Sequence, residues 1–333
     1  MIVLAIESSC DETAVAVIED KKKIRSSIVA SQIDIHKEFG GVVPEVASRI
    51  HIENISYCIS QALEQAEMTM DDIDAVAVTK GPGLIGCLHV GVQAAKTLAF
   101  AYEKPLIPVH HIAAHIYANE LVVDMKYPVL ALVVSGGHSQ LVYMKEEGSF
   151  EILGQTQDDA IGEAYDKVAR VMNLGYPGGP KIDNLAKEGQ PIYDLPKPKT
   201  QGKYDLSFSG LKSGVLQFIK RMERQGQSFD SANLAASFQE VALTQVFDKI
   251  RLVLEDYPDI CHFVVGGGVS ANSRLREMVQ DLEKEYPNVT FTVPPMSCCT
   301  DNAAMIGVAG TIAYQQGRFA DDSLSADSGW EIQ

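Results

Sequence analysis

Two histidines spaced four residues apart are the part of this sequence best suited to chemistry. His111 and His115 lie in the run PVHHIAAHIYA. In a helix this spacing places both imidazole rings on one face, one turn apart, where they can bind one metal ion. Asp301, in the distant run SCCTDNAAM, is a candidate third ligand. The alternative for the pair alone is two helix histidines that make ordinary hydrogen bonds.

The length and composition of the chain fit a globular protein with two domains. It has 333 residues, 46% of them hydrophobic and 22% charged, and this length exceeds what a single core usually serves. No apolar stretch is long enough and free enough of charge to span a membrane. The N-terminal run MIVLAIESSCDET has no basic segment ahead of its apolar residues. We therefore expect no signal peptide and a cytoplasmic protein.

The six cysteines are expected to be reduced thiols, because they show neither a CxxC pair nor the spacing of a disulfide framework. They are Cys10, Cys58, Cys87, Cys261, Cys298 and Cys299. The last two lie beside Asp301 and offer sulfur ligands. The competing interpretation is that they are small buried residues.

The net charge of −16 argues against a protein that coats nucleic acid by itself, because phosphate contacts require clustered lysine and arginine. A local basic patch is still compatible with this charge. One candidate group is Lys197, Lys199 and Lys203, and the other is Lys212, Lys220, Arg221 and Arg224. The sequence alone favours a solvated loop for the first group and a solvated helix face for the second.

The chain repeats one pattern of elements. Three strands are predicted near the N-terminus, in IVLAIESS, TAVAVIED and IRSSIVAS, and three more in PVLALVVSGG, SQLVYMKE and FEILGQTQ. In each half a strand, a glycine loop and a helix follow, in IDAVAVTKGPGLIG and ICHFVVGGGVSANSRL, and then a short strand (PLIPV, VTFTV) and a last helix. Both halves therefore predict βββαβαβα with a mixed sheet covered on both faces, and helices inserted between residues 159 and 257.

This repeat predicts an α/β protein with two lobes and a cleft between them. We expect one lobe at residues 1–124 and the other at 125–333, with the C-terminal helix able to pack back on the first. Loops at strand ends should face the cleft. Those at 8–11, 81–83, 135–138 and 266–268 are rich in glycine or serine. Because their backbone amides can approach a phosphate closely, they predict nucleotide binding.

The repeat also relates the candidate metal ligands to one another. His111 and His115 open the last helix of the first half, and Asp301 opens the last helix of the second. We therefore expect the histidines from one lobe and the carboxylate from the other to converge across the cleft. This ligand set suits Zn²⁺ or Fe²⁺, with positions left open for water or substrate.

The motifs of this chain resemble those of the tRNA N6-adenosine threonylcarbamoyltransferases, a branch of the superfamily of actin, sugar kinases and the Hsp70 ATPase, whose duplicated lobes are ribonuclease H-like. The matching runs follow one another over about nine tenths of the chain, which makes the resemblance specific. They are IESSCDETAVAV, GGVVPEVASRIH, TKGPGLIGCLHVG, VHHIAAHIYAN, VSGGHSQLV, GEAYDKVAR, YPGGPKIDNLA, DLSFSGLKSGV, GGGVSANSRLR and CCTDNAAMIG.

The resemblance implies a reaction and its participants. The threonylcarbamoyl group of threonylcarbamoyl-AMP would pass to N6 of the adenosine just 3′ of the anticodon, in tRNAs that read codons beginning with A, and AMP would leave. One Fe²⁺ or Zn²⁺ ion would be held by His111, His115 and Asp301. The implied partners are tRNA, a smaller paralogue of the same fold and a P-loop ATPase, with a separate enzyme supplying the adenylate. Given its acidic charge, we expect the chain alone to bind tRNA weakly.

The resemblance also implies which residues bind the adenylate intermediate. These are Val134, Ser135, Gly136, Gly137, His138, Asp166, Gly179, Asp183 and Asn272. For the two aspartates the alternative is a carboxylate at a helix N-terminus or on the surface. For Asn272 the local sequence favours a helix cap, whereas the resemblance favours an adenine contact.

Three residues are candidates for taking the proton from N6: Glu12, Asp11 and His138. A solvated turn is the alternative for the two acids, and hydrogen bonding is the alternative for His138.

Three other functions fit parts of the pattern. A kinase or ATPase of the same superfamily usually carries an aspartate-glycine phosphate loop in each half, whereas ESSCDET lacks glycine and VSGGHS lacks aspartate. A zinc peptidase, an older description of this family, needs glutamate directly after the first histidine, where this chain has Ile112. A catalytically idle binding subunit would lose the histidine pair, which this chain keeps.

Overall fold

The computed structural model describes residues 1–332 and divides into two compact units. Unit 1 comprises Met1–Asp124 together with the segment from Pro294 onward, and unit 2 comprises Met125–Val293. No helix within residues 1–332 has the length and apolar character needed to cross a bilayer. All six cysteines lie in this range as free thiols.

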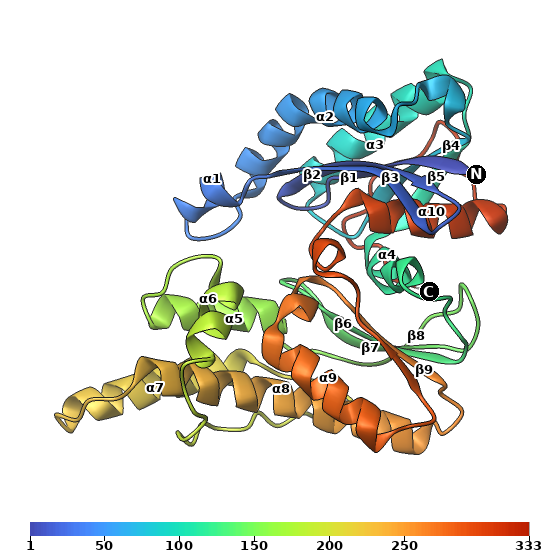
Figure 1. The fold of residues 1–333 in the computed structure, drawn as a ribbon. Helices are drawn as coiled ribbons and strands as arrows, with labels where there is room; N and C mark the ends of the chain where they lie inside the picture. Colours follow the sequence, from blue (N-terminus) through green and yellow to red (C-terminus); the bar gives the residue numbers. More distant parts are fainter. Residues whose placement is uncertain (333) are drawn as a thin grey trace. The chain divides into compact units, whose positions relative to one another are not determined.

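Unit 1 is built on a five-stranded mixed sheet in the order β3-β2-β1-β4-β5 (Figure 1). Its strands are β1 (Ile2–Glu7), β2 (Glu12–Glu19), β3 (Lys23–Ser31), β4 (Ala75–Gly81) and β5 (Leu106–His110). The first three pair antiparallel, and β4 and β5 extend the sheet in parallel from β1. β1 is the central strand, and its residues are almost all apolar because both of its faces are buried.

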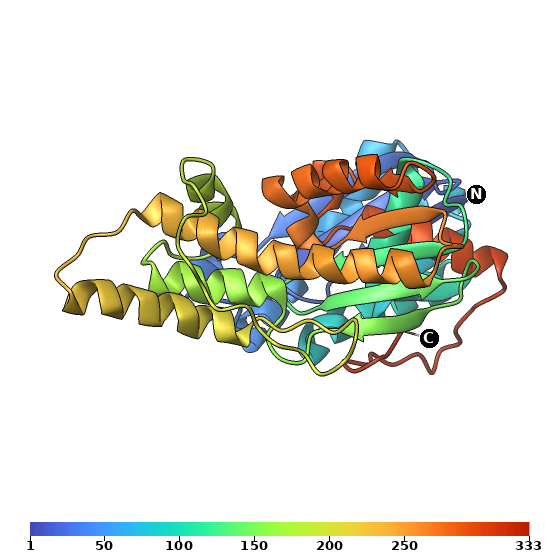
Figure 2. The ribbon, with the colours of Figure 1, turned by 90° about the horizontal axis from the view of Figure 1, so that it is seen from below.

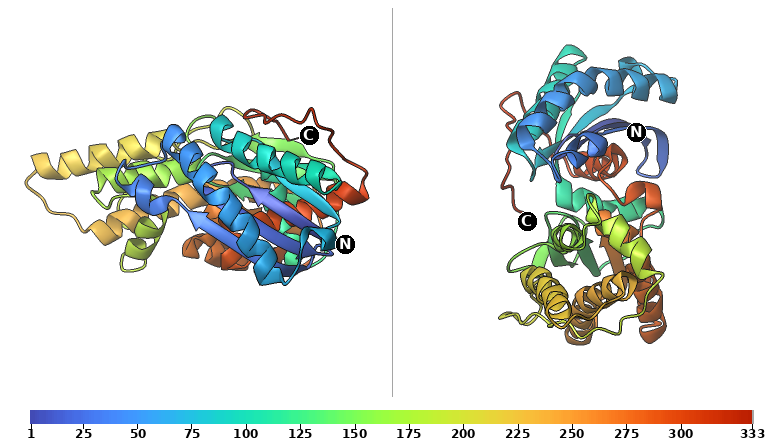
Figure 3. Two further views of the ribbon diagram at one scale, coloured as in Figure 1. Left: turned by 90° about the horizontal axis from the view of Figure 1, so that it is seen from above. Right: turned by 90° about the vertical axis from the view of Figure 1, so that its left-hand side faces the viewer.

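Helices cover both faces of this sheet, as the sequence pattern predicts. α2 and α3 pack on one face and α10 packs on the other (Figures 1 and 3). The α-helices of unit 1 are α1 (Ile33–Lys37), α2 (Pro44–Ala66), α3 (Ile85–Ala101), α4 (His111–Tyr117) and α10 (Ala303–Gln315). Its short 3₁₀ helices are η1 (Met70–Asp72), η2 (Ala118–Leu121) and η4 (Met296–Cys298).

Unit 2 repeats this arrangement, with the sheet order β10-β9-β6-β7-β8. The strands are β6 (Val129–Val134), β7 (Ser139–Met144), β8 (Glu151–Gln155), β9 (His262–Gly266) and β10 (Thr290–Thr292). β6 pairs antiparallel with β7 and parallel with β9, as β1 does with β2 and β4. Read from its other edge, the order matches that of unit 1, so the predicted duplication is confirmed.

The predicted insertion of unit 2 lies between β8 and β9. It contains α5 (Ile161–Val171), α6 (Gly178–Ala186), α7 (Ser209–Arg224) and α8 (Ser231–Asp256), and after β9 come η3 (Gly268–Ala271) and α9 (Ser273–Glu285). α7 and α8 run side by side (Figure 2). One face of β6, with Leu130 and Leu132, packs into a core to which these helices contribute Tyr165, Phe218 and Phe238.

The C-terminal segment differs from the predicted lobe boundary. The sequence pattern counts residues 294–333 with the second lobe but allows the C-terminal helix to pack back on the first, and in the structure the segment from Pro294 onward belongs to unit 1. The reason is the close packing of α10 on the first sheet. A Cβ atom added at Gly307 would lie 2.4 Å from the side chain of Ile18, and one at Gly310 would lie 2.5 Å from Ala77. Glycine at these two positions lets the helix approach β2 and β4.

Candidate metal centre

The histidine pair lies on α4, which begins directly after β5. The residue before the pair, His110, caps the helix, because its Nδ1 accepts hydrogen bonds from the N–H groups of Ile112 (3.2 Å) and Ala113 (3.4 Å). This cap starts the helix at His111. His115 follows one turn later on the same face, and the two rings meet edge to face with centroids 4.7 Å apart. The predicted helical spacing is therefore present.

Asp301 meets both histidines. Its Oδ1 lies 3.1 Å from Nε2 of His115 and 3.5 Å from Nε2 of His111. Asp301 immediately precedes Asn302, the N-cap of α10, whose Oδ1 accepts from the Met305 N–H at 3.0 Å. Because α10 belongs to unit 1, all three groups come from one unit. The expectation that the carboxylate comes from the other lobe is wrong in this respect.

The three donor atoms fit a divalent transition metal. Their spacing of 3.1 and 3.5 Å is close to that of atoms sharing an ion at about 2.0–2.2 Å. Within residues 1–332 they form the one group of three or more His, Cys, Asp or Glu side chains with ligand atoms this close together, all within 4.8 Å of one another. His115 is 1% exposed and Asp301 21% exposed. Solvent therefore reaches the candidate metal centre more readily beside Asp301 than beside His115.

Glu7, which the sequence pattern does not single out, lies directly behind His111. This buried carboxylate on β1 accepts from Nδ1 of His111 at 3.0 Å, from the Thr79 hydroxyl at 2.6 Å and from the Ser9 N–H at 2.5 Å. A hydrogen bond at Nδ1 leaves Nε2 to face Asp301. Nδ1 of His115 is buried and has no hydrogen-bond partner within the described chain. Of the two histidines, therefore, only His111 has a carboxylate at Nδ1, the ring nitrogen that faces away from Asp301.

The pKa values of Glu7 and His111 reflect this pairing. Burial by itself raises the pKa of Glu7, but the charge and hydrogen bond of His111 outweigh it and the pKa is lowered. Burial by itself lowers the pKa of His111, but Asp301 and Glu7 outweigh it and raise the pKa to about 9. Without a metal, both ring nitrogens of His111 are therefore protonated at neutral pH, and the ring is positively charged.

Neighbouring residues exclude two alternative centres. Cys298 and Cys299 are buried and do not belong to the ligand group, and Cys299 Sγ instead donates to the Pro295 carbonyl at 3.3 Å. The residue after His111 is Ile112, which is 2% exposed and apolar. A peptidase of the HExxH type needs a glutamate there, so this helix cannot supply its general base.

The two acidic candidates for proton transfer lie in the turn between β1 and β2. Asp11 is buried, and its carbonyl accepts from the Gln32 N–H at 3.0 Å. Glu12 opens β2 and accepts from the Ser31 hydroxyl at 3.3 Å. Burial, followed by the negative charges of Asp11 and Asp301, raises the pKa of Glu12 to about 10. In the metal-free state the Glu12 carboxyl is therefore protonated at neutral pH.

The glycine loop at residues 81–83 is covered by the chain itself. Lys80 and Gly83 hydrogen-bond to Asp327 and Ser328 of the C-terminal segment. A Cβ atom at Gly81 would lie 1.8 Å from the Asp327 carbonyl oxygen. Close packing against the C-terminal segment therefore explains glycine at this position.

Several glycines of unit 2, unlike Gly81, have open space beside them. Val134 ends β6, and the turn at 135–138 closes through a hydrogen bond from the Ser135 N–H to the His138 carbonyl at 2.8 Å. Cβ atoms added at Gly136, Gly137, Gly179 or Gly268 would meet nothing within 4 Å. These glycines leave open space beside exposed backbone, which is what close approach of a ligand to backbone amides requires.

The candidate polar residues of unit 2 are joined by short contacts. Asp166, on α5, accepts from the Gly178 N–H at the start of α6 at 2.6 Å, and burial raises its pKa. Asp183, on α6, accepts from the Ser273 hydroxyl at 2.8 Å at the start of α9. Each aspartate thus holds the N-terminus of a neighbouring helix, the role that the sequence leaves open beside ligand binding.

Asn272 caps α9, as its local sequence predicts. Its Oδ1 accepts from the Leu275 N–H at 2.9 Å, and its Nδ2 donates to Oε1 of Gln239 at 2.7 Å. Gln239, on α8, also accepts from the Tyr165 hydroxyl at 3.2 Å. The sequence pattern misses Gln239, as it misses Glu7, because neither stands in a motif with ligand spacing.

Solved structures with this fold have little sequence similarity to the chain. HypF from T. kodakarensis superposes with a TM-score of 0.63 at 12% identity, covering 97% of this chain and 49% of HypF. Component A of (R)-2-hydroxyglutaryl-CoA dehydratase from Acidaminococcus fermentans gives a TM-score of 0.54 at 14% identity, covering 95% and 98% of the two chains. At such identities the similarity shows the fold alone.

Sequence similarity identifies the family. A family model described as tRNA N6-adenosine threonylcarbamoyltransferase matches residues 23–308. A protein of that description from Geobacillus kaustophilus is 55% identical over 326 residues, covering 98% of this chain and 95% of that one. Another, from Bacillus cereus, is 53% identical over 333 residues, covering 100% and 97%. The chain therefore belongs to the tRNA N6-adenosine threonylcarbamoyltransferase family.

Proposed function

We propose that this chain transfers the threonylcarbamoyl group from threonylcarbamoyl-AMP to N6 of the adenosine just 3′ of the anticodon in tRNAs that read codons beginning with A. The new bond joins N6 to the carbamoyl carbon, the bond from that carbon to the phosphate oxygen breaks, AMP leaves and N6 loses a proton. The observation that carries the proposal is similarity above 50% identity over nearly the whole chain to proteins of that description.

In this proposal unit 2 holds the adenylate. The turn of Ser135, Gly136, Gly137 and His138 would hold the phosphate or the developing oxyanion, because the open space over its glycines admits a ligand. The Gly137 and His138 amides, which now donate to the Ser135 hydroxyl, would turn to the ligand beside the Gly136 amide. Val134 directly precedes this turn, and Gly179, at the start of α6, is a further glycine with open space beside it. Asp166, Asp183 and Asn272 are already hydrogen-bonded, so we assign them to ligand contact through their remaining acceptor capacity.

The metal ligands in this proposal are His111, His115 and Asp301, and the ion is Fe²⁺ or Zn²⁺, which two imidazoles and a carboxylate suit. When bound, such an ion supplies Lewis-acid polarisation of a substrate oxygen. Glu7 holds His111 in the tautomer that keeps Nε2 available.

Proton removal from N6 is assigned to Asp11 or His138 ahead of Glu12. With a pKa of about 10, Glu12 carries its own proton until a nearby cation offsets the charges of Asp11 and Asp301. In that protonated state Glu12 would donate a hydrogen bond to the substrate and would not accept the N6 proton.

We further propose a cytoplasmic enzyme that works with a smaller paralogue of the same fold and a P-loop ATPase, while a separate synthase supplies threonylcarbamoyl-AMP. The charge of −16 supports this arrangement, because an acidic chain gains from partners that help to bind tRNA.

The proposal is tested by incubating the chain with threonylcarbamoyl-AMP, an unmodified tRNA transcript and the partner proteins, and then analysing the digested tRNA by mass spectrometry. We expect threonylcarbamoyladenosine in the complete reaction and its loss with His111→Ala. A complete reaction that leaves the adenosine unmodified would overturn the proposed function.

A further inference from the structure

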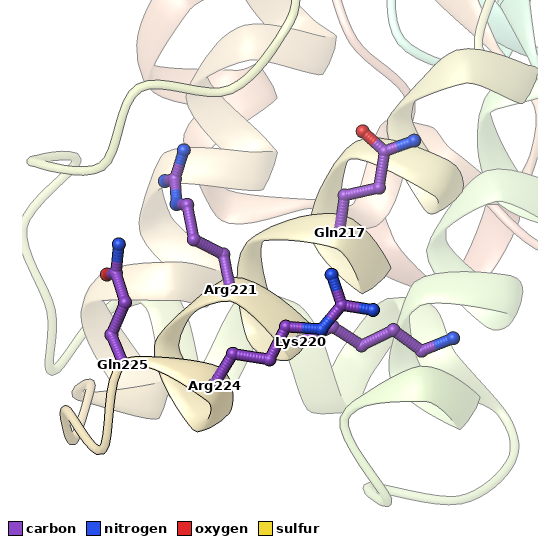
Figure 4. Close-up of a pocket in the computed structure, with 5 residues that line it drawn as sticks. All are labelled: Gln217, Lys220, Arg221, Arg224 and Gln225. Atoms are coloured by element: carbon purple, nitrogen blue, oxygen red, sulfur yellow. The ribbon is translucent and has the colours of Figure 1, made fainter.

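One face of α7 carries cations and amides without acidic side chains between them. It consists of Gln217, Lys220, Arg221, Arg224 and Gln225, which we call the basic face. Their spacing of three and four residues places them along one side of the helix. All five are exposed and together line a pocket of about 320 Å³ (Figure 4).

The cations of the basic face lack the ion pairs that other cations of unit 2 make. Arg251 pairs with Glu285 at 2.8 Å, Arg274 with Glu240 at 2.9 Å and Lys284 with Asp281 at 2.9 Å. In residues 1–332 no carboxylate lies within 4.0 Å of the charged groups of Lys220, Arg221 or Arg224. The chain has 44 acidic and 28 basic residues. In a chain with this acidic excess, the basic face presents three adjacent exposed cations that form no salt bridge with residues 1–332.

The basic face is held rigidly by the rest of unit 2. On the adjoining side of α7, Leu211, Val215 and Phe218 are buried in the core. Asp158 fixes the start of the helix, because it accepts from the N–H groups of Phe208 at 2.8 Å and Ser209 at 3.1 Å. The helix backbone is thus positioned before any ligand binds, and only the long side chains need to be ordered.

The chemistry of this face fits the phosphate backbone of a nucleic acid. Guanidinium and ammonium groups bind phosphate oxygens, and glutamine amides bind phosphate or ribose hydroxyls. The aromatic residue of α7, Phe218, is buried beneath Arg221, whose guanidinium lies 5.3 Å from the ring centre. The face therefore has no exposed ring on which a base can stack, which favours contact with the backbone over reading of bases.

We propose that the basic face of α7 binds the phosphate backbone of the tRNA substrate. This inference rests on the proposed function for the identity of the nucleic acid. Three phosphate contacts are too few for tight binding by an acidic chain, but they orient a tRNA that partner proteins help to hold. Lys212 is also on α7, but it lies on another side of the helix and is not part of the basic face.

The test compares two triple variants with the same change in net charge. Lys220→Gln/Arg221→Gln/Arg224→Gln removes the basic face. Lys203→Gln/Arg251→Gln/Lys284→Gln removes three cations that already pair with carboxylates. The dissociation constant for a tRNA transcript is measured by filter binding at several salt concentrations, with the full chain alone and with its partner proteins.

We expect the α7 variant to bind tRNA at least about tenfold more weakly at low salt, and the slope of log K against log salt to fall by about 2 to 3. The control variant should stay within about twofold of the wild type, as expected when its cations contact no phosphate. Equal losses in both variants, or an unchanged slope in the α7 variant, would overturn the inference. So would a variant that loses binding to phosphatidylglycerol vesicles while its tRNA binding is unchanged.

Failure of this inference is distinct from failure of the proposed function. A wild type that modifies tRNA while the α7 variant binds it normally refutes only the role of α7. A wild type that binds tRNA through α7 but never forms threonylcarbamoyladenosine refutes only the proposed reaction.

Discussion

Glu7 and His111 are 104 residues apart in the chain, yet the Glu7 carboxylate accepts a hydrogen bond from the His111 ring at 3.0 Å. Glu7 ends the central strand β1, and His111 begins α4. The contact therefore links the middle of the first sheet to a candidate metal ligand. A carboxylate behind a ligating histidine fixes its tautomer and raises its basicity.

Substitution of Glu7 by glutamine should weaken metal binding without removing a ligand. We expect the affinity for Zn²⁺ to fall about 10- to 100-fold, the range typical of outer-shell partners. Titration with a competing chromophoric chelator measures the change. Glu38→Gln, which neutralises an exposed carboxylate, is the matched control and should bind as the wild type does. Wild-type affinity in Glu7→Gln would show that the pair has no role in the metal centre.

Removal of a ligand should have a larger effect. We expect Asp301→Ala and His115→Ala each to lower metal affinity by more than about 100-fold, beyond the effect of an outer-shell change. Elemental analysis of the purified chains gives the metal content. Cys299→Ser changes a buried neighbour outside the ligand group and should retain the ion. Retention of metal by Asp301→Ala would place the site elsewhere.

Metal affinity should rise with pH. The pKa of His111 is raised to about 9 in the metal-free chain, so below that pH a metal ion has to displace its proton. We expect affinity to increase about tenfold per pH unit from pH 6 to 8 and to level off near pH 9. Calorimetry in buffers of different ionisation enthalpy counts the released protons. In Glu7→Gln the dependence should shift to lower pH, because the Glu7 charge helps to raise that pKa.

His262 should make unit 2 less stable in acid. Burial, and then the charge of Lys126, lower the pKa of His262 from 6.5 to about 4. Its Nδ1 accepts from the Lys126 N–H and its Nε2 faces the Thr292 hydroxyl at 2.8 Å, so a second ring proton would displace a bond. Between these pH values the unfolded chain binds a proton that the native chain does not, so the free energy of unfolding falls as pH falls.

The expected loss from pH 7 to pH 5 is about 2 kcal/mol for this group. Urea unfolding of the wild type and His262→Asn at both pH values measures it, and the loss should be smaller by about this amount in the variant. His89→Gln, at an exposed position, should show the wild-type dependence. A variant with the full wild-type loss would show that other groups cause it.

Truncation of the C-terminal segment should loosen the metal helix. Nε2 of His110 donates to the Trp330 carbonyl at 2.9 Å, and Lys80 lies 4.5 Å from the Trp330 ring centre. A chain ending at Ala326 loses this bond and those of Asp327 and Ser328, at about 1 kcal/mol each. Its melting temperature and metal affinity should both fall. Trp330→Ala keeps the backbone acceptor and should lose only about 0.5–1 kcal/mol.

Much of the fold could be predicted from local patterns. Apolar runs of strand length, glycine turns and helix starts recur in one order, and the two sheets share that order. The spacing of His111 and His115 sufficed to place both rings on one helical face, because that geometry depends only on residues within one turn. The capping role of Asn272 was likewise predicted by its local sequence.

Contacts between distant residues decided the rest. Asp301 reaches the histidines from unit 1 because Gly307 and Gly310 let α10 pack closely on the first sheet, a choice of partner that the duplicated pattern leaves open. Covering of the loop at 81–83 depends on Asp327, and orientation of His111 depends on Glu7. The sequence by itself determined which elements form and which side chains share a face. Only the tertiary structure decided which of those faces meet, because packing and buried hydrogen bonds join residues that no local spacing relates.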